Sequence, residues 1–214
     1  MSKDPKNTKA LVVDDHPVIR AAVRMVLPKE RFRTILEARN GVEAVQMARA
    51  HQPELIVLDI DMPGLDGLEV LSRLKELESS CRILVYTSYE AVFYCTRCMR
   101  SGASGYISKT NDLEALSKAI KAVMAGYTYF PRLDSSSVNT SHLQYTEMQL
   151  IEKLSDRELT IFQALAQGLT NKEIAQLMIL SHKTVSTYKT RLIEKLKVTS
   201  AVHLRDFAKR NHVI

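Results

Sequence analysis

The sequence has few cysteines, no long apolar run and no apolar segment near its start. A helix needs roughly 20 consecutive apolar residues to span a membrane, and no run approaches that length. Residues 1–9 are polar and lack the apolar core of a secretory signal peptide. We therefore expect a cytoplasmic protein with no membrane partner.

The spacing of the three cysteines does not predict a metal site. Cys95 and Cys98 make a single C-x-x-C, whereas a structural zinc site needs four ligands. The sequence has no second cysteine pair and no histidine at zinc spacing, and its six histidines are scattered. We expect Cys95 and Cys98 to be small buried side chains on a helix.

The net charge of +6 is unevenly distributed along the chain. The first 130 residues hold 18 Lys and Arg against 16 Asp and Glu, whereas the remaining 84 hold 12 against 8. The length of 214 residues is enough for two small domains, and the apolar share of 45% is ordinary for a globular protein. This asymmetry of charge predicts a basic C-terminal module that binds a polyanion.

Short apolar segments alternate with helical patterns over residues 1–127. The strand-like segments are 9–13, 34–38, 54–58, 82–86 and 105–109, and helical patterns follow at about 17–27, 41–50, 68–77, 91–100 and 111–125. The run from Leu55 to Leu58 is apolar throughout, which is typical of a strand buried on both faces of a parallel sheet. This alternation predicts an α/β domain with a flavodoxin-like, doubly wound parallel sheet of five strands.

Five polar residues come at the carboxyl ends of these predicted strands, namely Asp14, Asp15, Asp59, Thr87 and Lys109. Open α/β sheets bind their ligands at that edge. An isolated Asp59 would more often be a turn or helix-capping residue. The shared position of the five residues favours a functional site instead, with Asp59 as a metal ligand, a nucleophile or both.

Converging carboxylates repel one another unless a cation lies between them. Mg²⁺ suits this place because it prefers oxygen ligands and often bridges to phosphate. We assign Asp14 and Asp15 to hold the metal, with Asp59 and the carbonyl of Asp61 completing its ligands. Asp59 is then placed to attack a phosphoryl group, and the lysine and threonine at the same edge would stabilise the developing charge.

The composition changes after residue 127. Residues 134–141 are polar and aperiodic, so we expect a linker over residues 128–150. Residues 151–214 show four helical patterns, for which the expected N-caps are Ser155, Asn171, Ser181 and Ser200. A short helix and a tight turn precede the longer helix, which predicts an all-α, four-helix domain of the helix-turn-helix type.

The expected helix over residues 181–197 carries five basic residues and one acidic residue. Basic residues alone usually mark a solvated face. The polar face of this helix is also rich in small hydroxyl side chains, which suit hydrogen bonds to base edges. We therefore expect this helix to bind double-stranded DNA. The predicted contact residues are Lys172, Lys183, Thr184, Ser186, Thr187, Tyr188, Lys189, Thr190 and Arg191.

The last expected helix has an apolar face made of Leu204, Phe207 and Ala208. This face is larger than a terminal helix needs, so we expect it to form a two-fold contact in a homodimer. Such a dimer would bind two half-sites about ten base pairs apart, or a multiple of that distance.

Two groups of motifs resemble known families. Asp14-Asp15, Asp59 with Met62-Pro63 and Asp66-Gly67, Thr87, and Tyr106 three residues before Lys109 resemble the receiver domain of bacterial response regulators. Leu154 to Glu158, Gly168 to Ala175, Thr184-Val185 and Lys195-Leu196 resemble the LuxR-type helix-turn-helix of NarL/FixJ regulators, nearest to the BvgA/EvgA branch. The resemblance implies a two-component response regulator that binds promoter DNA and controls transcription.

The resemblance also implies partners and roles. A sensor histidine kinase or phosphorelay donor would phosphorylate Asp59, and Thr87, Ser88 and Tyr106 would bind the phosphate or report its presence. RNA polymerase would be a partner on DNA. The chain would be no enzyme apart from self-phosphorylation and autodephosphorylation. The family often has asparagine in place of Asp61, which bears on the lifetime of the phosphorylated form.

Other interpretations have their own signatures. Phosphatases of the haloacid-dehalogenase type carry a D-x-D after a strand, as in Asp59-Ile60-Asp61, but on their first strand, and the basic module would be unexplained. Fast turnover of a small phosphate ester would favour that enzyme, and slow stoichiometric labelling would favour the regulator. A LuxR-type sensor of small molecules would need an apolar pocket. A receiver that acts without phosphate would not need the complete acidic, threonine and lysine set.

Overall fold

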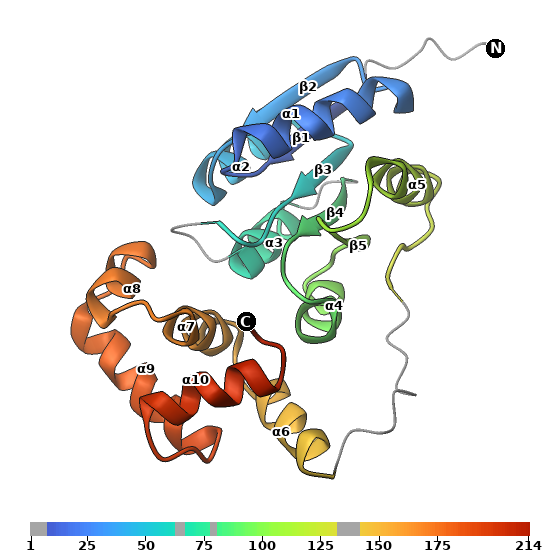
Figure 1. Cartoon of the computed structure of the whole chain (residues 1–214). Coiled ribbons are helices and arrows are strands. Elements are labelled where there is room, and N and C mark those ends of the chain that lie inside the picture. Colours follow the sequence, from blue (N-terminus) through green and yellow to red (C-terminus); the bar gives the residue numbers. More distant parts are fainter. Residues whose placement is uncertain (1–7, 63–66, 78–80, 132–141) are drawn as a thin grey trace, which may run out of the picture. The chain divides into compact units, whose positions relative to one another are not determined.

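The computed structural model describes residues 8–62, 67–77, 81–131 and 142–214 (Figure 1). The chain divides into two compact units, residues 1–132 and 133–214. Pro63 and Asp66 of the receiver-like motif lie outside the described residues. Among the residues that the structure describes, no helix has the length and apolar character needed to cross a bilayer.

The first unit is built around a parallel sheet of five strands in the order β2-β1-β3-β4-β5. The strands are β1 (Lys9–Val13), β2 (Thr34–Ala38), β3 (Leu55–Leu58), β4 (Arg82–Thr87) and β5 (Gly105–Ser108). The helices are α1 (Pro17–Val26), the 3₁₀ helix η1 (Leu27–Glu30), α2 (Gly41–His51), α3 (Gly67–Lys75), α4 (Ala91–Arg100) and α5 (Leu113–Met124). The predicted doubly wound sheet is confirmed.

The core of the first unit lies against both faces of this sheet. On one face, Val23 of α1 and Ile120 of α5 pack with Val57 and Leu84 of the central strands. Leu55 to Leu58 are at most 2% exposed, as the continuous apolar pattern of β3 predicted. A strand covered on both faces holds the residue that follows it in a defined place.

The carboxyl ends of the strands meet at one edge and bring together residues that are far apart in the sequence. The register pairs Val13 with Leu58. Asp59 N then donates to Val13 O at 2.9 Å, which extends the β1–β3 ladder by one residue. Lys109 N donates to Thr87 O at 2.8 Å and extends β5 beside β4 in the same way.

Cys95 and Cys98 lie on α4 outside any disulfide, with exposed fractions of 2% and 0%, and are buried as predicted. Burial raises the pKa of Cys95, so its thiol is protonated near neutral pH. Neither cysteine belongs to the cluster of potential metal ligands that the described residues form.

In the described residues of the second unit, all regular secondary structure is helical. Its helices are α6 (His142–Glu152), α7 (Asp156–Gln167), α8 (Asn171–Leu177), α9 (His182–Lys195) and α10 (Ala201–Arg210). The serine N-caps of α7, α9 and α10 are confirmed, since each accepts a backbone N–H three residues on. The cap of α8 is Thr170 rather than the predicted Asn171, because Thr170 forms a full capping box with Glu173.

The predicted linker, residues 128–150, begins too early. Tyr129 forms a parallel bridge with Gly105 of β5. Its carbonyl oxygen accepts Tyr106 N at 2.7 Å. These backbone bonds attach the start of the predicted linker to the edge of the sheet, a contact that its composition does not reveal.

The predicted linker also ends too late, because α6 occupies its last part. The Glu147 carboxylate binds Arg210 Nη2 at 2.7 Å and Asn211 Nδ2 at 2.7 Å. Ile151 of the same helix is buried. Polar contacts with the far end of the unit thus hold α6, and its polar sequence misled the prediction. Residues 132–141 of the predicted linker lie outside the described residues.

The assignment of Leu204, Phe207 and Ala208 to a dimer contact is wrong. Their exposed fractions are 1%, 2% and 0%. The Phe207 ring meets Phe162 of α7 edge-on, with 6.2 Å between the ring centroids. This face of α10 packs against α7 in the core of the unit, so it is not available to a second copy.

The buried face of α10 leads to the first prediction. Phe207→Ala should destabilise the second unit by about 3–5 kcal/mol, because it removes a buried ring and leaves a cavity. Val202→Ala is the matched control on the same helix: Val202 is 71% exposed, so the change should stay within about 0.5 kcal/mol. Thermal unfolding of the full chain followed by circular dichroism checks both. A stable Phe207→Ala variant with weakened self-association would restore the dimer assignment.

Candidate functional site

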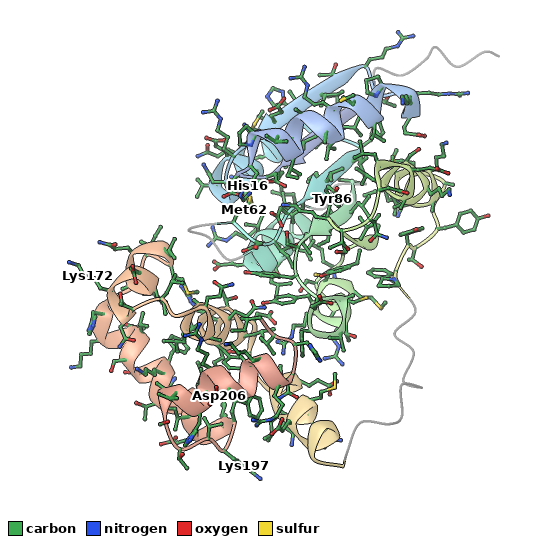
Figure 2. The ribbon with its side chains drawn as sticks, in the orientation of Figure 1. His16, Met62, Tyr86, Lys172, Lys197 and Asp206 are labelled. Carbon is green, nitrogen blue, oxygen red and sulfur yellow. The ribbon has the colours of Figure 1, made fainter. Side chains whose placement is uncertain are left out.

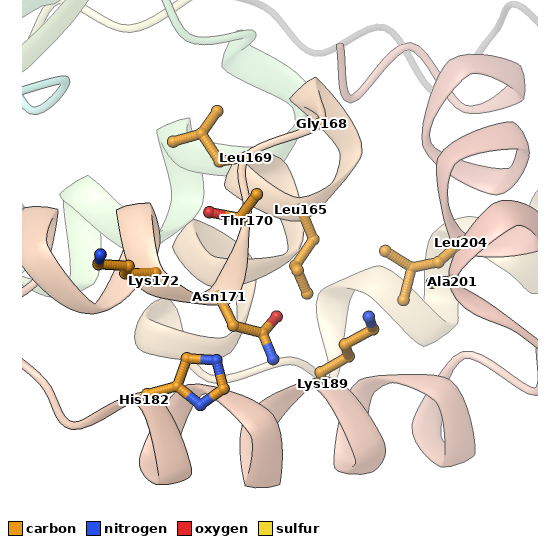
Figure 3. A pocket seen from close by; sticks show the side chains of 10 residues that line it. All are labelled: Leu165, Gly168, Leu169, Thr170, Asn171, Lys172, His182, Lys189, Ala201 and Leu204. Atoms are coloured by element: carbon orange, nitrogen blue, oxygen red, sulfur yellow. The ribbon is translucent and has the colours of Figure 1, made fainter.

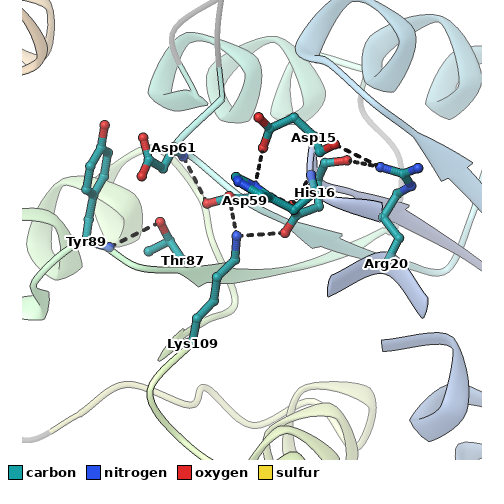
Figure 4. Close-up of polar contacts among 9 residues, drawn as sticks. Asp15, His16, Arg20, Asp59, Asp61, Thr87, Tyr89 and Lys109 are labelled. Carbon is teal, nitrogen blue, oxygen red and sulfur yellow. Dashed lines mark hydrogen bonds and ion pairs between the residues drawn. The ribbon is translucent and has the colours of Figure 1, made fainter. Parts of the chain in front are cut away.

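Asp59 lies directly after β3 with its side chain only 1% exposed. Lys109 reaches it from the end of β5. Its Nζ lies 2.5 Å from Asp59 Oδ2 and 2.8 Å from Asp14 Oδ2 (Figure 4). Three residues that the sequence places after separate strands are therefore in direct contact, and one ammonium group faces two buried carboxylates.

One carboxylate oxygen of the acidic pair after β1, Asp15 Oδ1, accepts no hydrogen bond. Asp14 Oδ1 accepts His16 N at 2.8 Å. Asp15 Oδ1 is buried and accepts no hydrogen bond, although His16 Nδ1 lies 2.8 Å away and would form an ion pair when protonated. One ligand atom from each of these three residues lies within 4.8 Å of the others. This donor set, rich in carboxylate oxygen, fits a divalent cation.

The electrostatics of the cluster favour an added positive charge. Burial raises the pKa of the Asp14 carboxyl and the charge of Asp59 adds to this, while the hydrogen bond from Lys109 opposes it only in part. Burial alone would lower the pKa of Lys109, but the charge of Asp59 and hydrogen bonds to both carboxylates raise it, so the ammonium stays protonated. Lys109 alone does not neutralise the acidic edge.

Asp61 has a partner that sequence reasoning missed. Asp61 N donates to Asp59 Oδ1 at 2.9 Å, and the Asp61 carboxylate is hydrogen bonded by the side chain of Tyr89. The Tyr89 ring stacks on Tyr94 with 4.6 Å between centroids. Figure 4 shows Tyr89 beside Asp61. The only sequence signal for Tyr89 was an aromatic residue two positions after Thr87.

Thr87 and Tyr106 are buried and are connected through the backbone of Tyr89. The Tyr106 hydroxyl donates to Tyr89 O at 2.6 Å. Tyr89 N lies 3.4 Å from Thr87 Oγ1, a long hydrogen bond. Tyr106 is 1% exposed, so its ring points inward. Ser88, which lies between Thr87 and Tyr89 in the sequence, is exposed. A displacement of the Thr87 hydroxyl would reach Tyr106 through these two bonds.

The outer face of α9 carries the side chains predicted for DNA contact. A shallow groove of about 350 Å³ is lined by Ser181, Lys183, Thr184, Thr187, Tyr188 and Arg191. On the opposite side, Val185 and Leu192 are fully buried. Lys195 at the end of α9 binds the buried Glu158 of α7 at 2.7 Å. The groove therefore lies on a helix that is held along its length.

A second hollow, of about 460 Å³, lies between the start of α8, α9 and the start of α10 (Figure 3). Its lining residues are Leu165, Gly168, Leu169, Thr170, Asn171, Lys172, His182, Lys189, Ala201 and Leu204. Figure 3 shows Lys189 extending from α9 toward Ala201 and Leu204. Lys172 stands at the surface of the unit (Figure 2). Two lysines and a histidine around one hollow suit an anionic group such as a phosphate.

The hydroxyl groups on α9 are already partly used within the helix. Thr187 Oγ1 donates to Lys183 O at 3.0 Å, and Thr190 Oγ1 donates to Ser186 O at 3.2 Å. Each threonine thus uses its hydroxyl proton within the helix, and its oxygen remains available as an acceptor. Such a side chain can accept a hydrogen bond from a base amino group or pack on a thymine methyl.

The two units together define a class of protein, namely regulators that take up a signal on an α/β domain and bind DNA with a helix-turn-helix. Residues 10–121 match the response regulator receiver domain, and residues 152–208 match the luxR family of bacterial regulatory proteins. The chain belongs to the response regulators of the NarL/FixJ type, which carry a LuxR-type DNA-binding domain.

Similar proteins cover nearly the whole chain. The virulence-factor transcription regulator BvgA of Bordetella pertussis is 50% identical over 205 residues, which are 96% of this chain and 98% of that protein. The DNA-binding transcriptional activator EvgA of Escherichia coli is 35% identical over 204 residues, 95% of this chain and 98% of that protein. RcsB from Salmonella enterica serovar Typhimurium, solved on promoter rprA with the phosphomimetic BeF₃⁻, superposes with a TM-score of 0.68 at 22% identity and covers 95% of this chain and 99% of its own. The likeness to RcsB shows the fold.

The excess negative charge leads to the second prediction. Asp14→Asn should raise the melting temperature of the metal-free chain, because it removes a buried charge that Lys109 offsets only in part. The folded protein binds the Asp14 proton more tightly than the unfolded chain does. The contribution of Asp14 to stability should therefore fall as the pH rises from the ordinary pKa of 3.8 through the raised one.

Differential scanning calorimetry of the parent and the variant across pH 4–7 isolates this contribution, because the stability of the parent relative to the variant should fall as the pH rises. Glu114→Gln is the control, because Glu114 belongs to an exposed pair with Lys118 and its loss should change stability by no more than about 0.5 kcal/mol. A melting temperature of Asp14→Asn at or below that of the parent would contradict the charge argument.

Proposed function

We propose that Asp59 accepts a phosphoryl group from a sensor histidine kinase or phosphorelay donor, and that the phosphorylated chain acts as a homodimer on promoter DNA in the cytoplasm. One observation carries the first part. Asp59 is a buried carboxylate at a sheet edge in contact with Lys109 and beside an acidic pair that lacks a full set of partners. The DNA-binding part rests on family membership and on the hydroxyl-rich face of α9.

The chemistry is a transfer between two nucleophiles. An oxygen of the Asp59 carboxylate attacks phosphorus, a P–O bond forms, and the P–N bond to the donor histidine breaks. The leaving imidazole keeps the electron pair of that bond and takes up a proton. Lys109 pairs with Asp59 before transfer, and the same ammonium is placed to pair with a phosphoryl oxygen afterwards.

The acidic residues supply the oxygen ligands for Mg²⁺ in this proposal. Asp14 and Asp15 hold it, with Asp59 and the carbonyl of Asp61 completing its ligands. Bound Mg²⁺ would neutralise negative charge on the donor phosphoryl oxygens. The unused oxygen of Asp15 and the raised pKa of Asp14 support this role. Hydrolysis of the acyl phosphate returns the chain to its first state, so it catalyses only its own phosphorylation and dephosphorylation.

The phosphoryl group is reported through Thr87 and Tyr106. The Thr87 hydroxyl turns to the phosphoryl oxygen, and Tyr89 N loses its acceptor. Because Tyr89 O holds the Tyr106 hydroxyl, the β4–α4 segment and the aromatic ring move together. This movement changes the surface that a second copy meets, and the dimer then presents two α9 helices to DNA, where RNA polymerase is the further partner.

The third prediction tests the phosphoacceptor. With Mg²⁺ and a small acyl-phosphate donor, intact-mass measurement should find one phosphoryl group per chain, stable in acid and labile in base. Asp59→Asn should abolish it, because the amide is a poor nucleophile. Asp61→Asn is the matched control and should still be labelled, since Asp61 contacts the site through its backbone N–H. Labelling of Asp59→Asn at the parent rate would place the acceptor elsewhere.

The fourth prediction separates base contacts from phosphate contacts on α9. Thr187→Ala should cost about 1–3 kcal/mol on the best DNA site and relax the preference at one base position, since Thr187 lines the outer groove. Lys189→Ala should weaken binding to all sequences about equally and reduce the salt slope by roughly one unit. Titrations on specific and scrambled DNA over a salt series measure both effects.

The same titrations supply the control. Arg205 is exposed on α10 and lines neither hollow, and Arg205→Ala should leave the base preference unchanged. If Thr187→Ala and Lys189→Ala behaved alike on both DNAs, the assignment of the two surfaces to bases and phosphates would be wrong.

A further inference from the structure

Arg20 of α1 is a buried cation that sequence reasoning did not single out. It is 7% exposed, although arginine is seldom buried unless it is paired. It lies in the first turn of α1, five residues after Asp15, and Figure 4 shows it beside Asp15 on the side away from Lys109. Within the loop that holds Asp14 and Asp15, it contacts the main-chain oxygens of these residues rather than their carboxylates.

The guanidinium group of Arg20 joins two segments of the sheet edge. Its Nη1 donates to Asp14 O at 2.9 Å and to Asp15 O at 3.2 Å. Its Nε donates to Glu37 Oε2 at 3.0 Å, and Glu37 lies on β2. Because the guanidinium is planar and rigid, these bonds fix both carbonyl groups relative to a neighbouring strand.

We infer that Arg20 is a positioning residue for the divalent-cation site, which holds the main chain of Asp14 and Asp15 so that their carboxylates converge. The inference rests on the proposed function of that acidic pair. The orientation of a peptide group sets the direction of the adjoining side chains, and Mg²⁺ accepts only a narrow range of ligand geometry. Residues that orient metal ligands in this way affect affinity strongly.

A purely electrostatic role for Arg20 and a positioning role predict opposite changes in Mg²⁺ affinity when Arg20 is removed. Arg20 carries a positive charge close to a cation site, so its charge by itself weakens binding of a second cation. Glu37 offsets part of that charge through the Nε contact. If Arg20 mattered only as a charge, removing it would strengthen Mg²⁺ binding. If it positions the ligands, removing it weakens binding.

Arg24 offers a matched control. It lies on the same helix, carries the same charge and pairs with the same Glu37, with its Nη1 2.9 Å from Oε1. Its side chain is 59% exposed, against 9% for Arg20. Arg20→Lys and Arg24→Lys both keep the charge, but lysine at position 20 cannot span two carbonyls and a carboxylate.

The experiment measures the Kd of Mg²⁺ for the full chain by isothermal titration calorimetry, without any phosphodonor. Arg20→Lys should raise the Kd about tenfold, and Arg24→Lys should change it by no more than about twofold. Arg20→Gln should also raise the Kd, although it removes a positive charge. Melting temperatures in metal-free buffer are recorded alongside, because a merely structural role would lower them and leave the Kd of the folded protein unchanged.

A double-mutant cycle keeps the test decisive if Arg20→Gln folds poorly. Glu37→Gln should weaken Mg²⁺ binding in the parent and should have little effect in the Arg20→Lys background, because Glu37 acts through Arg20. Additive effects, a parent-like Kd for Arg20→Lys, or tighter binding by Arg20→Gln would each overturn the inference. Failure of the parent chain to bind Mg²⁺ would instead refute the proposed metal role of Asp14 and Asp15.

Discussion

The contact of one ammonium group with two buried carboxylates is the interaction on which the first unit depends. Parallel strands place their carboxyl ends together, so Asp14, Asp59 and Lys109 converge whatever their distance in the sequence. Without Lys109 the edge would hold uncompensated negative charge on two buried carboxylates. With it, the carboxylates stay close enough to share a cation, and the raised pKa of Asp14 marks the charge that remains unbalanced. Such tension is common at functional sites, where an arrangement that suits a ligand costs the free protein stability.

Tyr89 connects the acidic edge of the sheet with Thr87 and Tyr106. Its side chain is hydrogen bonded to Asp61, its N–H faces Thr87 Oγ1, and its carbonyl holds the Tyr106 hydroxyl. One residue therefore touches an acidic neighbour of Asp59 and both residues proposed to report phosphorylation. Stacking of Tyr89 on the buried ring of Tyr94 extends the connection to α4. In the proposed function, the loss of any one of these bonds would loosen the others, which is how a small change at Asp59 could move a whole segment.

The second unit shows how packing separates two kinds of surface on one helix. The apolar side of α9 is buried, and the Lys195–Glu158 pair holds its end to α7. The outer side then offers a hydroxyl-lined groove and, next to it, a hollow bordered by Lys172 and Lys189. The hydroxyls of Thr187 and Thr190 donate to main-chain carbonyls within the helix, so toward DNA they can act only as acceptors. A rigid helix with short side chains lets base edges approach closely, while longer cations at its side reach phosphates.

The sequence by itself determined the sheet, the residues at its carboxyl edge and the helix-turn-helix, because apolar periodicity and turn residues act over a few positions and parallel strands share one direction. Only the tertiary structure decided what those elements touch. The apolar face of Leu204 and Phe207 could have met a second copy, but α7 covers it, since burial of an apolar face does not specify its partner. The helix α6 was hidden because its polar residues are held by Arg210 and Asn211 from the far end of the unit. Arg20 and Tyr89 escaped notice for a related reason. Arg20 donates to two main-chain carbonyls, and Tyr89 connects Thr87 with Tyr106 through its own N–H and carbonyl. Contacts of main-chain atoms cannot be read from the sequence.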